Sequence, residues 1–563
     1  MQVLKRPMPV GIEDFKDLVT RNYYFIDKTR FIKGLIDTQG KVALITRPRR
    51  FGKTLSLSML QYFFTLDNAE DNRKLFAGLD IERAGERYMQ EQGSHPVVFL
   101  TLKEVRAGKQ NVMMDLLARV LQGLCKRYQY MLSSDRLSEE DKNNFRKLLE
   151  LRGNEADMRL SLCSLMQWLE AFHSKKPVLL LDEYDAPILS AWENGYYQEC
   201  IDFMQGFLGS ALKTNPALGF AVLTGITRIS KESIFSGLNN LKVCSVLSNH
   251  YNDIFGFTQE EAATLLAECG SEDKLAELAK WYDGYQFGDA EIYNPWSVIQ
   301  YIDNDCKFQR YWINVSGNSI LQVLLKNVDE ARYEELQSLL RFREASVDTM
   351  MDEGIIYPDI ETDDNALYMM LLTTGYLKAI KTWQDRRGRW WCRLQIPNRE
   401  VLLAYEDEVL AKVAGPGNRV PLFAMLNAMT AGKASVFQKH LSKILRDMVS
   451  CHDTAQPESF YHGLMLGLTV LMEGEYRVES NRESGYGRFD LAFFPLHPGT
   501  PGVILELKAA GSDEGLEEKA QEALQQIAEK AYCAEFSRQG VSDIWSYGIA
   551  FCGKKICLKG TQG

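Results

Sequence analysis

A glycine–lysine–threonine triplet, Gly52-Lys53-Thr54, has the residue types that bind a nucleoside triphosphate. An apolar run, Val42–Thr46, precedes the triplet, and an amphipathic stretch follows it from Leu55. This order of strand, loop and helix is that of a P-loop, in which backbone N–H groups and the helix N-terminus hold the phosphates. We therefore expect Lys53 to reach the β- and γ-phosphates of ATP and Thr54 to hold Mg²⁺.

The loop before this triplet departs from the usual P-loop pattern at its first position. Arg47 stands where a P-loop has a glycine, and a glycine there eases the opening turn of the loop. Either the loop starts differently or nucleotide binding is weakened. The residues that we expect to contact the nucleotide in this loop are Arg47, Arg50, Phe51, Gly52, Lys53, Thr54 and Leu55.

Adjacent carboxylates follow a second apolar run, Val178–Leu181. In P-loop ATPases the strand beside the P-loop strand ends in this way, with an aspartate for Mg²⁺ and a glutamate that polarises the attacking water. We expect Asp182 to bind the metal and Glu183 to activate water, with Asp185 as a candidate auxiliary ligand. The alternative is an acidic turn after a buried strand, which the upstream triplet makes the weaker interpretation.

A third apolar run, Phe220–Thr224, is followed by an arginine, Arg228. Thr224 is a candidate sensor of the γ-phosphate, and Arg228 is a candidate to neutralise its charge, as arginines do in phosphoryl transfer. A surface ion pair is the alternative role for Arg228.

Two acids and a lysine near the C-terminus could hydrolyse a phosphodiester. Asp490 opens one strand-like stretch, and Glu506 and Lys508 lie two residues apart on another, so that they share a face. The carboxylates would hold Mg²⁺, which polarises the phosphate and generates hydroxide, while the lysine orients or stabilises the reacting group. A salt bridge on the surface is the alternative, because Glu-x-Lys alone is common.

The elements that must position these residues alternate between strands and helices in the first half. Buried apolar runs separated by amphipathic stretches predict an α/β fold with a mainly parallel sheet covered on both faces. From about residue 258 to 345 the pattern is helical, and a strand–turn–strand is expected at 376–396. The segment 414–418 is the best linker candidate, since glycine and proline interrupt it.

Composition excludes several classes of protein. The 563 residues include 65 basic and 75 acidic side chains, a formal net charge of −10, and 45% are hydrophobic. The chain is too apolar to be disordered and lacks the basic excess of a histone-like coat, although a local basic surface suffices for nucleic-acid binding. Eleven scattered cysteines without C-x-x-C spacing predict reduced thiols. We expect a cytoplasmic protein without a membrane partner, and an oligomer is compatible with the sequence.

The N-terminal motifs together resemble one family. The stretches GIEDFKDLV, NYYFIDKTRFIKGLI, TRPRRFGKTLSLSML, LLLDEYDAPI and TGITRISKESIFSGLNNL are similar to the AAA-ATPase-like family of many anaerobic and gut bacteria, and WYDGYQFGDAEIYNPWSVIQYI extends the match. In that family an arginine-rich loop with Arg in place of the first glycine is the usual form. The resemblance covers roughly residues 5–300 and implies an ATPase core with a helical lid.

The C-terminal motifs resemble the PD-(D/E)XK nuclease superfamily. PESFYHGLMLGLTV, YRVESNRESGYGRFDLAFFP and GVILELKAA are similar to the nuclease-like domain that commonly follows this ATPase, over roughly residues 430–555. The resemblance implies a core site of Asp490, Glu506 and Lys508, with Glu458 or Glu479 as an extra acid. Gln526 and Tyr532 would correspond to a secondary motif that positions the substrate, and many superfamily members bind rather than cut.

The predicted organisation has four parts. They are a P-loop ATPase core at 1–250, a helical lid at 251–345, a mixed α/β connector at 346–417, for which a winged-helix-like arrangement is one option, and a restriction-endonuclease-like α/β domain at 418–563. A basic and aromatic cluster, 386–393, falls in the connector, where arginines could bind phosphates and tryptophans could contact bases. A solvated turn with inward-packed tryptophans is the alternative.

The leading hypothesis is an ATP-binding switch that controls a Mg²⁺-dependent nuclease acting on DNA or RNA, in defence or mobile-element biology. The alternative is a nucleotide-gated binding or signalling protein whose nuclease-like domain recognises a partner without cleavage. A third hypothesis is an ATP-dependent regulator of another protein that makes no nucleic-acid contact.

Overall fold

The chain folds into two compact units. The computed structural model describes residues 6–213, 215–228, 241–316, 345–352, 357–361, 363–405, 419–448, 475–480, 483–484, 487–530 and 533–562, and the single residues 339, 354, 461, 465 and 472. Unit 1 comprises Met1–Arg332 and Ser346–Val401, and unit 2 comprises Tyr333–Ala345 and Leu402–Gly563. Residues 346–401 of the predicted connector thus cluster with unit 1, and the four-part division of the chain remains a prediction.

Unit 1 is built on a five-stranded parallel sheet with the strand order β2-β3-β4-β1-β5. The strands are β1 (Val42–Thr46), β2 (Val97–Thr101), β3 (Val178–Asp182), β4 (Ala221–Gly225) and β5 (Leu241–Cys244). Every residue of β1, β3 and β4 is buried, as expected for apolar strands covered on both faces. The predicted α/β fold class is confirmed.

One expectation about this sheet is wrong. The strand that ends in Asp182, β3, pairs with β2 and β4 and does not neighbour the P-loop strand β1. Strand β4 is inserted between them, with Leu223 opposite both Leu44 and Leu181. Apolar strands joined by helical crossovers carry no signal of their spatial order. The order of the motifs along the chain therefore did not reveal the insertion.

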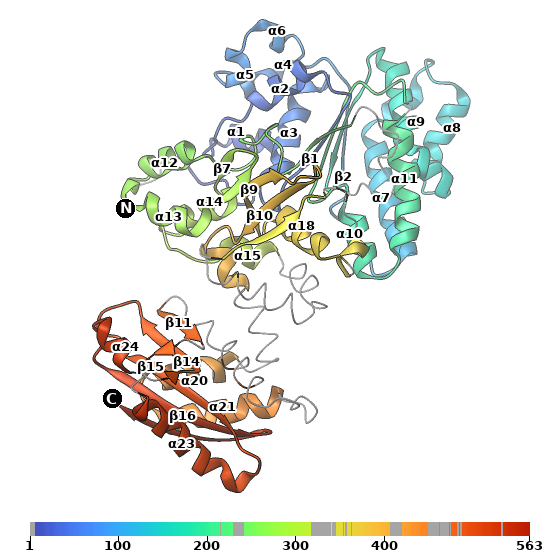
Figure 1. Ribbon diagram of the computed structural model, residues 1–563. Coiled ribbons are helices and arrows are strands. Elements are labelled where there is room, and N and C mark those ends of the chain that lie inside the picture. Colours follow the sequence, from blue (N-terminus) through green and yellow to red (C-terminus); the bar gives the residue numbers. More distant parts are fainter. Residues whose placement is uncertain are drawn as a thin grey trace. The chain divides into compact units, whose positions relative to one another are not determined.

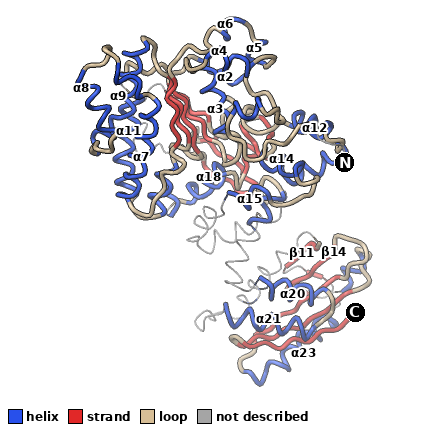
Figure 2. The backbone as a smooth tube through the Cα atoms, turned by 180° about the vertical axis from the view of Figure 1, so that it is seen from behind, coloured by secondary structure: helices blue, strands red, loops and turns tan. Residues whose placement is uncertain are grey.

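Helices cover both faces of this sheet (Figures 1 and 2). One layer contains α7 (Gln110–Arg127), α8 (Glu139–Leu149), α9 (Glu155–His173) and α11 (Tyr197–Leu212). The other side carries α1 (Phe15–Thr20), α2 (Arg30–Thr38) and α3 (Lys53–Phe64). Helix α3 begins at the residue after Gly52. The loop between β1 and α3 therefore lies at the carboxyl end of β1.

The predicted helical lid is helical over its described part. It contains α12 (Gln259–Glu268), α13 (Leu275–Tyr282), α14 (Pro295–Asp303) and α15 (Tyr311–Ser316), with a small hairpin of β6 (Tyr285–Phe287) and β7 (Ala290–Ile292). A capping box between Thr258 and Glu261 starts α12. Buried tyrosines such as Tyr282 and Tyr301 fill its core.

A second sheet in unit 1 confirms the predicted strand–turn–strand. Its order is β8-β10-β9, all antiparallel, with β8 (Val347–Met350), β9 (Lys378–Gln384) and β10 (Trp390–Gln395). Helix α18 (Asp364–Thr374) precedes β9.

Unit 2 contains a five-stranded mixed sheet with the order β11-β14-β15-β16-β17. The strands are β11 (Tyr476–Ser480), β14 (Leu491–Pro495), β15 (Gly502–Ala509), β16 (Ile544–Cys552) and β17 (Lys555–Gln562), and only β15 and β16 among these pair in parallel. Helices α20 (Arg419–Thr430) and α21 (Ala434–Met448) pack on one face, and α23 (Leu516–Glu529) and α24 (Cys533–Arg538) on the other.

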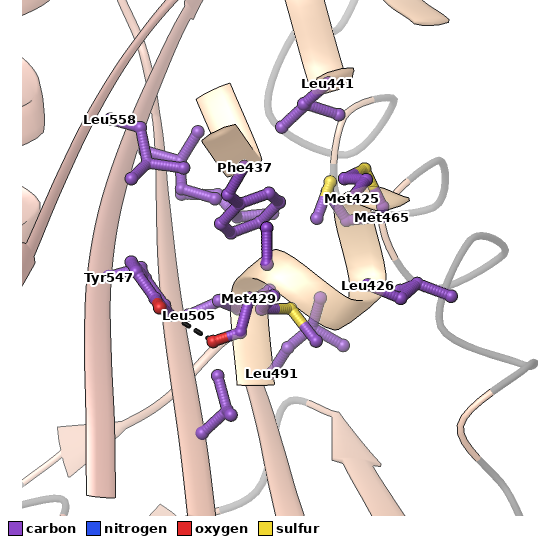
Figure 3. Close-up of a cluster of buried hydrophobic side chains, with 14 of the residues drawn as sticks. Met425, Leu426, Met429, Phe437, Leu441, Met465, Leu491, Leu505, Tyr547 and Leu558 are labelled. Carbon is purple, nitrogen blue, oxygen red and sulfur yellow. Dashed lines mark hydrogen bonds between the residues drawn. The ribbon is translucent and has the colours of Figure 1, made fainter. Parts of the chain in front are cut away.

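The core between α20, α21 and the sheet fixes this face of unit 2 (Figure 3). Met425, Met429 and Phe437 are buried against Leu505 and Tyr547. The Tyr547 hydroxyl donates to the Met429 carbonyl at 2.7 Å, which satisfies the one polar group of this side chain. In the described part of the chain, no helix has both the length and the apolar character needed to cross a membrane.

Candidate active sites

The loop between β1 and α3 makes its tight turns after Arg47. Arg50 and Gly52 have φ angles of 69° and 78°, in the left-handed region, whereas Arg47 does not have a positive φ. A glycine therefore suits position 52, immediately before α3. The position that Arg47 occupies has no such requirement. Phe51 is buried against Tyr285 and Phe287, which anchors the loop to the β6–β7 hairpin.

The Arg47 side chain is fully buried. Its guanidinium donates to the carbonyls of Thr46 and Cys244, both at 2.8 Å, and of Tyr251 at 3.0 Å. Phe287 lies 4.8 Å from the guanidinium carbon, and burial lowers the pKa of Arg47 to about 10. These contacts join the start of the loop to β5 and to the segment after it.

Lys53 is also buried, at the first position of α3. Its ammonium donates to the carbonyls of Arg47 at 2.9 Å and Pro48 at 2.8 Å. Burial lowers the pKa of Lys53, although nearby carboxylates, Glu183 first among them, act in the opposite direction. Loop carbonyls therefore hold the lysine at the place where a bound phosphate would compete for it.

A chain of hydrogen bonds joins the first turn of α3 to the ends of β3 and β4 at the C-terminal edge of the sheet. The Thr54 hydroxyl donates to Oδ2 of Asp182 at 2.7 Å, and the Thr224 hydroxyl donates to Oδ1 at 2.5 Å. Asp182 is fully buried, and Thr224 is nearly so. The inserted strand β4 supplies Thr224, so the insertion fixes one oxygen of the carboxylate while α3 fixes the other.

Glu183 has a left-handed backbone, with a φ of 50°, that turns its side chain out of the β3 direction. Its carboxylate lies 3.3 Å from the Arg106 guanidinium and forms part of the wall of a large cavity. Burial raises the pKa of Glu183, while the charges of Lys53 and Arg106 lower it. A carboxylate with a raised pKa at a cavity wall suits proton transfer.

The other two predicted residues of this region have different surroundings. Asp185 Oδ2 accepts hydrogen bonds from the backbone N–H groups of Ile226 at 2.7 Å and Thr227 at 3.0 Å. Arg228 lines a small cavity of about 30 Å³ together with Thr46 and Asp352, apart from the large cavity. Asp185 therefore ties β3 to the end of β4, and the role of Arg228 at a phosphate stays a prediction.

The large cavity has a volume of about 500 Å³, which is within the usual range for a ligand site. The P-loop residues Arg50–Leu55 line one side of it. Apolar side chains from the N-terminal segment and the lid, including Ile12, Phe25 and Phe257, line another part, and charged side chains such as Glu183 also contribute. Arg50 stacks over Trp296 of the lid at 4.4 Å. Our reading of individual residues missed these groups, because apolar side chains give no sign of the ligand that they cover.

The carboxylates of unit 2 lie on neighbouring strands. Leu491 of β14 is opposite Leu505 of β15, so antiparallel pairing places Asp490 beside Glu506. Asp490 Oδ2 accepts a hydrogen bond from the Leu507 backbone N–H at 2.8 Å. Glu506 is buried, and its Oε1 lies 4.0 Å from the Lys508 ammonium. The three residues of the predicted D…E-x-K motif are thus brought together.

Helix α23 supplies a fourth group to this site. The Gln526 side-chain amide donates to Glu506 Oε1. Gly548 of β16 lies opposite Glu506, and a Cβ at this position would overlap the backbone of Ala520 and Leu524. The absence of a side chain at Gly548 therefore lets α23 approach the sheet closely enough for Gln526 to reach the carboxylate.

The remaining residues predicted for unit 2 are not all described. Glu458 and Tyr532 lie outside the described residues. Glu479 is on β11, opposite Ala492, and forms an ion pair with Arg477. Gln525, the neighbour of Gln526, bonds instead to Glu529 on the exposed side of α23.

The donor groups at both sites suit a hard cation such as Mg²⁺. A hydroxyl and a carboxylate meet at Thr54 and Asp182, and two carboxylates meet at Asp490 and Glu506. In the part of the chain that the structure describes, no three Asp, Glu, His or Cys side chains form a metal-binding cluster. Mg²⁺ does not need one, because it commonly uses one or two carboxylates and completes its shell with phosphate oxygens and water.

The fold and these sites define an α/β P-loop unit in the same chain as a mixed-sheet unit with a carboxylate–lysine site. Residues 9–235 match the family described as Predicted AAA-ATPase, and residues 456–560 match the PD-(D/E)XK nuclease superfamily. These two matches agree with the AAA-ATPase-like and PD-(D/E)XK nuclease resemblances that the motifs indicate. It is also 25% identical over 568 residues to a protein of Azotobacter chroococcum mcd 1 named "Uncharacterized protein in vnfD 5′region", covering 97% of this chain and 96% of that protein.

Proposed function

We propose that unit 1 binds and hydrolyses ATP and that unit 2 is a Mg²⁺-dependent nuclease acting on DNA or RNA. The observation that carries the first half is the hydrogen-bonded chain Thr54–Asp182–Thr224 beside a cavity of about 500 Å³. The observation that carries the second half is the pairing of Asp490 with Glu506, with Lys508 alongside.

In the ATPase site, each residue has a separate task. Lys53 would exchange its loop carbonyls for phosphate oxygens, and Thr54 and Asp182 would hold Mg²⁺, which would supply positive charge at the phosphates. Glu183 accepts a proton from the attacking water, and its raised pKa makes the carboxylate a stronger base. Arg47 acts through its backbone carbonyl and by fixing the loop, and Arg228 would have to turn from its small cavity to meet the γ-phosphate.

In the nuclease site, Asp490 and Glu506 would hold Mg²⁺, which would polarise the phosphate and activate water. Lys508 stabilises the charge that develops on the phosphate. Gln526 keeps Glu506 in one orientation, which a metal ligand requires.

A buried contact supports coupling of ATP use to the rest of the chain. The Trp312 indole N–H donates to the Arg49 carbonyl of the P-loop at 2.9 Å, and the Trp312 backbone N–H donates to Glu400 at 2.6 Å. Glu400 is fully buried and also accepts from Ser297 at 2.7 Å. Glu400 lies one residue before the end of unit 1. A change in the conformation of the P-loop would therefore alter the contacts of the residue at which the chain leaves unit 1.

The test incubates the full chain with Mg²⁺ and ATP against single- and double-stranded DNA and RNA. Wild type is run beside Lys53→Ala and Asp490→Ala. We expect ATP hydrolysis to fail in the first variant and cleavage to fail in the second. Folded Asp490→Ala that still cuts would overturn the nuclease half. Unchanged nucleotide binding in Lys53→Ala would overturn the phosphate-binding role of the loop. Nucleic-acid binding without cleavage by wild type under any Mg²⁺ or Mn²⁺ condition would favour the binding and signalling alternative.

A further inference from the structure

The hairpin of β9 and β10 presents a basic surface that neither catalytic site uses. Residues 378–395 contain six lysine and arginine side chains and one acidic residue, in a chain whose net charge is −10. The turn 385–389 is held by Asp385, which accepts from the backbone N–H groups of Arg387 at 2.8 Å and Arg389 at 2.9 Å. The basic groups are therefore displayed on an ordered turn.

Pairing of the strands places cations and aromatic rings on one face. Trp391 is opposite Trp383, and Arg393 is opposite Lys381. The arginine and the lysine lie over the Trp383 ring at 5.8 Å and 5.9 Å. On the other face, Cys392 is buried against the rest of the unit. The tryptophans thus support the charged groups rather than fill a core, in contrast to the inward packing considered from the sequence.

Some of these charges are neutralised and others are available. Asp385 pairs with Arg389 at 2.7 Å, and Asp348 of β8 pairs with Arg393 at 2.7 Å. Within the described residues, no ion pair engages Lys381, Arg386 or Arg387, and all three are exposed. Three uncompensated cations on one hairpin suit a polyanion with regularly spaced charges.

An exposed ring lies next to the turn. Trp390 begins β10 on the face of Cys392, opposite the face of Trp391, and is 50% exposed, which is unusual for a side chain of this size. A flat ring next to cations is the arrangement that binds single strands, in which unpaired bases stack on aromatic side chains while phosphates follow the basic groups. A base pair inside a duplex offers no free face for such stacking.

We propose that the β9–β10 hairpin is a binding surface for single-stranded nucleic acid. Arg386 and Arg387 of the turn contact phosphates, and Trp390 next to the turn stacks on an unpaired base. Arg389 and Arg393 are held by their aspartates and shape the surface. This inference adds a recognition site outside both catalytic sites and does not depend on cleavage.

The test measures binding of the full chain in EDTA, which prevents cleavage. The probe is a fluorescein-labelled DNA single strand of about 20 nucleotides, compared with RNA of the same sequence and with the DNA duplex. Arg386→Ala/Arg387→Ala is compared with Arg119→Ala/Arg127→Ala, which removes two exposed arginines of α7 from the same unit. Anisotropy titrations at roughly 50 to 200 mM salt give the affinity and its salt dependence.

We expect Arg386→Ala/Arg387→Ala to weaken binding about tenfold and to reduce the slope of log affinity against log salt by about 1.4, which is two phosphate contacts on a single strand. The α7 double variant should bind as wild type does. Trp390→Ala should weaken binding about tenfold without changing the slope, and Trp390→Phe should recover most of the loss.

Three results would overturn the proposal. The first is that the wild-type protein does not bind the single strands. The second is that the hairpin and α7 double variants bind with equal affinity. The third is that the wild-type protein binds the duplex more tightly than either single strand. Binding in EDTA is measured apart from cleavage in Mg²⁺, so loss of binding in Arg386→Ala/Arg387→Ala is distinguishable from failure of the nuclease site, which is scored by cleavage alone.

Discussion

The candidate sites of units 1 and 2 each centre on a carboxylate at a strand end, but different groups hold it. Asp182 is fixed by two hydroxyls, from Thr54 and Thr224, on elements aligned by parallel strand pairing. Glu506 is fixed by the Gln526 amide from a helix that reaches it only because Gly548 has no side chain. The first site depends on strand register, and the second depends on how closely one helix packs.

This difference implies that the two sites respond differently when a ligand binds. The unit 1 site adjoins a cavity, and its lysine rests on loop carbonyls that a ligand can replace. The unit 2 carboxylates are held by protein groups before any substrate arrives. We therefore expect ligand binding to rearrange the first site and to leave the second largely as it is.

The largest expected effects come from neutralising one carboxylate in each unit. Asp182→Asn should lower ATP turnover by at least about 10²-fold, because an amide is a poor Mg²⁺ ligand. Asp490→Asn should lower nucleic-acid cleavage by a similar factor. Phosphate release and cleavage of a labelled strand are measured for both variants, with ATP omitted from the cleavage assay.

The two variants are each other's controls. Asp182→Asn should keep ATP-independent cleavage, and Asp490→Asn should keep ATP hydrolysis. A circular-dichroism melt shows whether each variant folds. Loss of both activities in a folded single variant would contradict the separation of the sites into two units.

A smaller effect should follow from changing the group that orients Glu506. Gln526→Ala removes the amide that donates to this carboxylate, and loss of such a supporting group commonly costs about 10- to 100-fold in activity or metal affinity. Gln525→Ala, one residue earlier on α23, removes a surface contact to Glu529 and should leave cleavage unchanged. Equal cleavage rates in the two variants would show that Glu506 does not need this partner.

The residues that carry the chemistry could be predicted because they form short patterns after apolar strands. Lys53 and Thr54 follow a glycine, Asp182 ends a buried run, and Glu506 and Lys508 share a face by the two-residue period of a strand. These local relations survive in the structure, which brings Thr54 to Asp182 and Asp490 to Glu506.

Long-range relations were not available from the same patterns. Nothing local in β4 indicates that it separates β1 from β3, and Trp312 lies 263 residues from its partner Arg49. Gly548 shows its role only once α23 is seen against the sheet. Tertiary packing decides these features, so one sequence read locally cannot supply them.

The contact between Trp312 and the P-loop should affect regulation more than either activity alone. Trp312→Phe keeps an aromatic ring and removes the indole N–H that donates to Arg49. Loss of one buried hydrogen bond is worth about 1 kcal/mol, so we expect the change that ATP causes in cleavage rate to fall by a factor of about 5. Cleavage without ATP should stay near wild type.

The measurement compares cleavage with and without ATP at saturating nucleotide. Trp168→Phe in α9 is the matched control, since its indole N–H donates to Asp141 and not to the loop. If Trp312→Phe responds to ATP as wild type does, this contact does not carry the coupling.

The smallest predicted effect is a shift in the pH dependence of ATP hydrolysis. Burial raises the pKa of Glu183, and the nearby Arg106 charge lowers it. Glu183 must be ionised to accept a proton from water, so activity should rise with pH through this pKa. Arg106→Ala removes a positive charge 3.3 Å from the carboxylate, which raises the pKa further and moves the acidic limb of the kcat profile to higher pH. Arg106→Lys keeps the charge and should leave the limb near its wild-type position. An acidic limb at the same pH in the alanine variant would mean that a group other than Glu183 controls it.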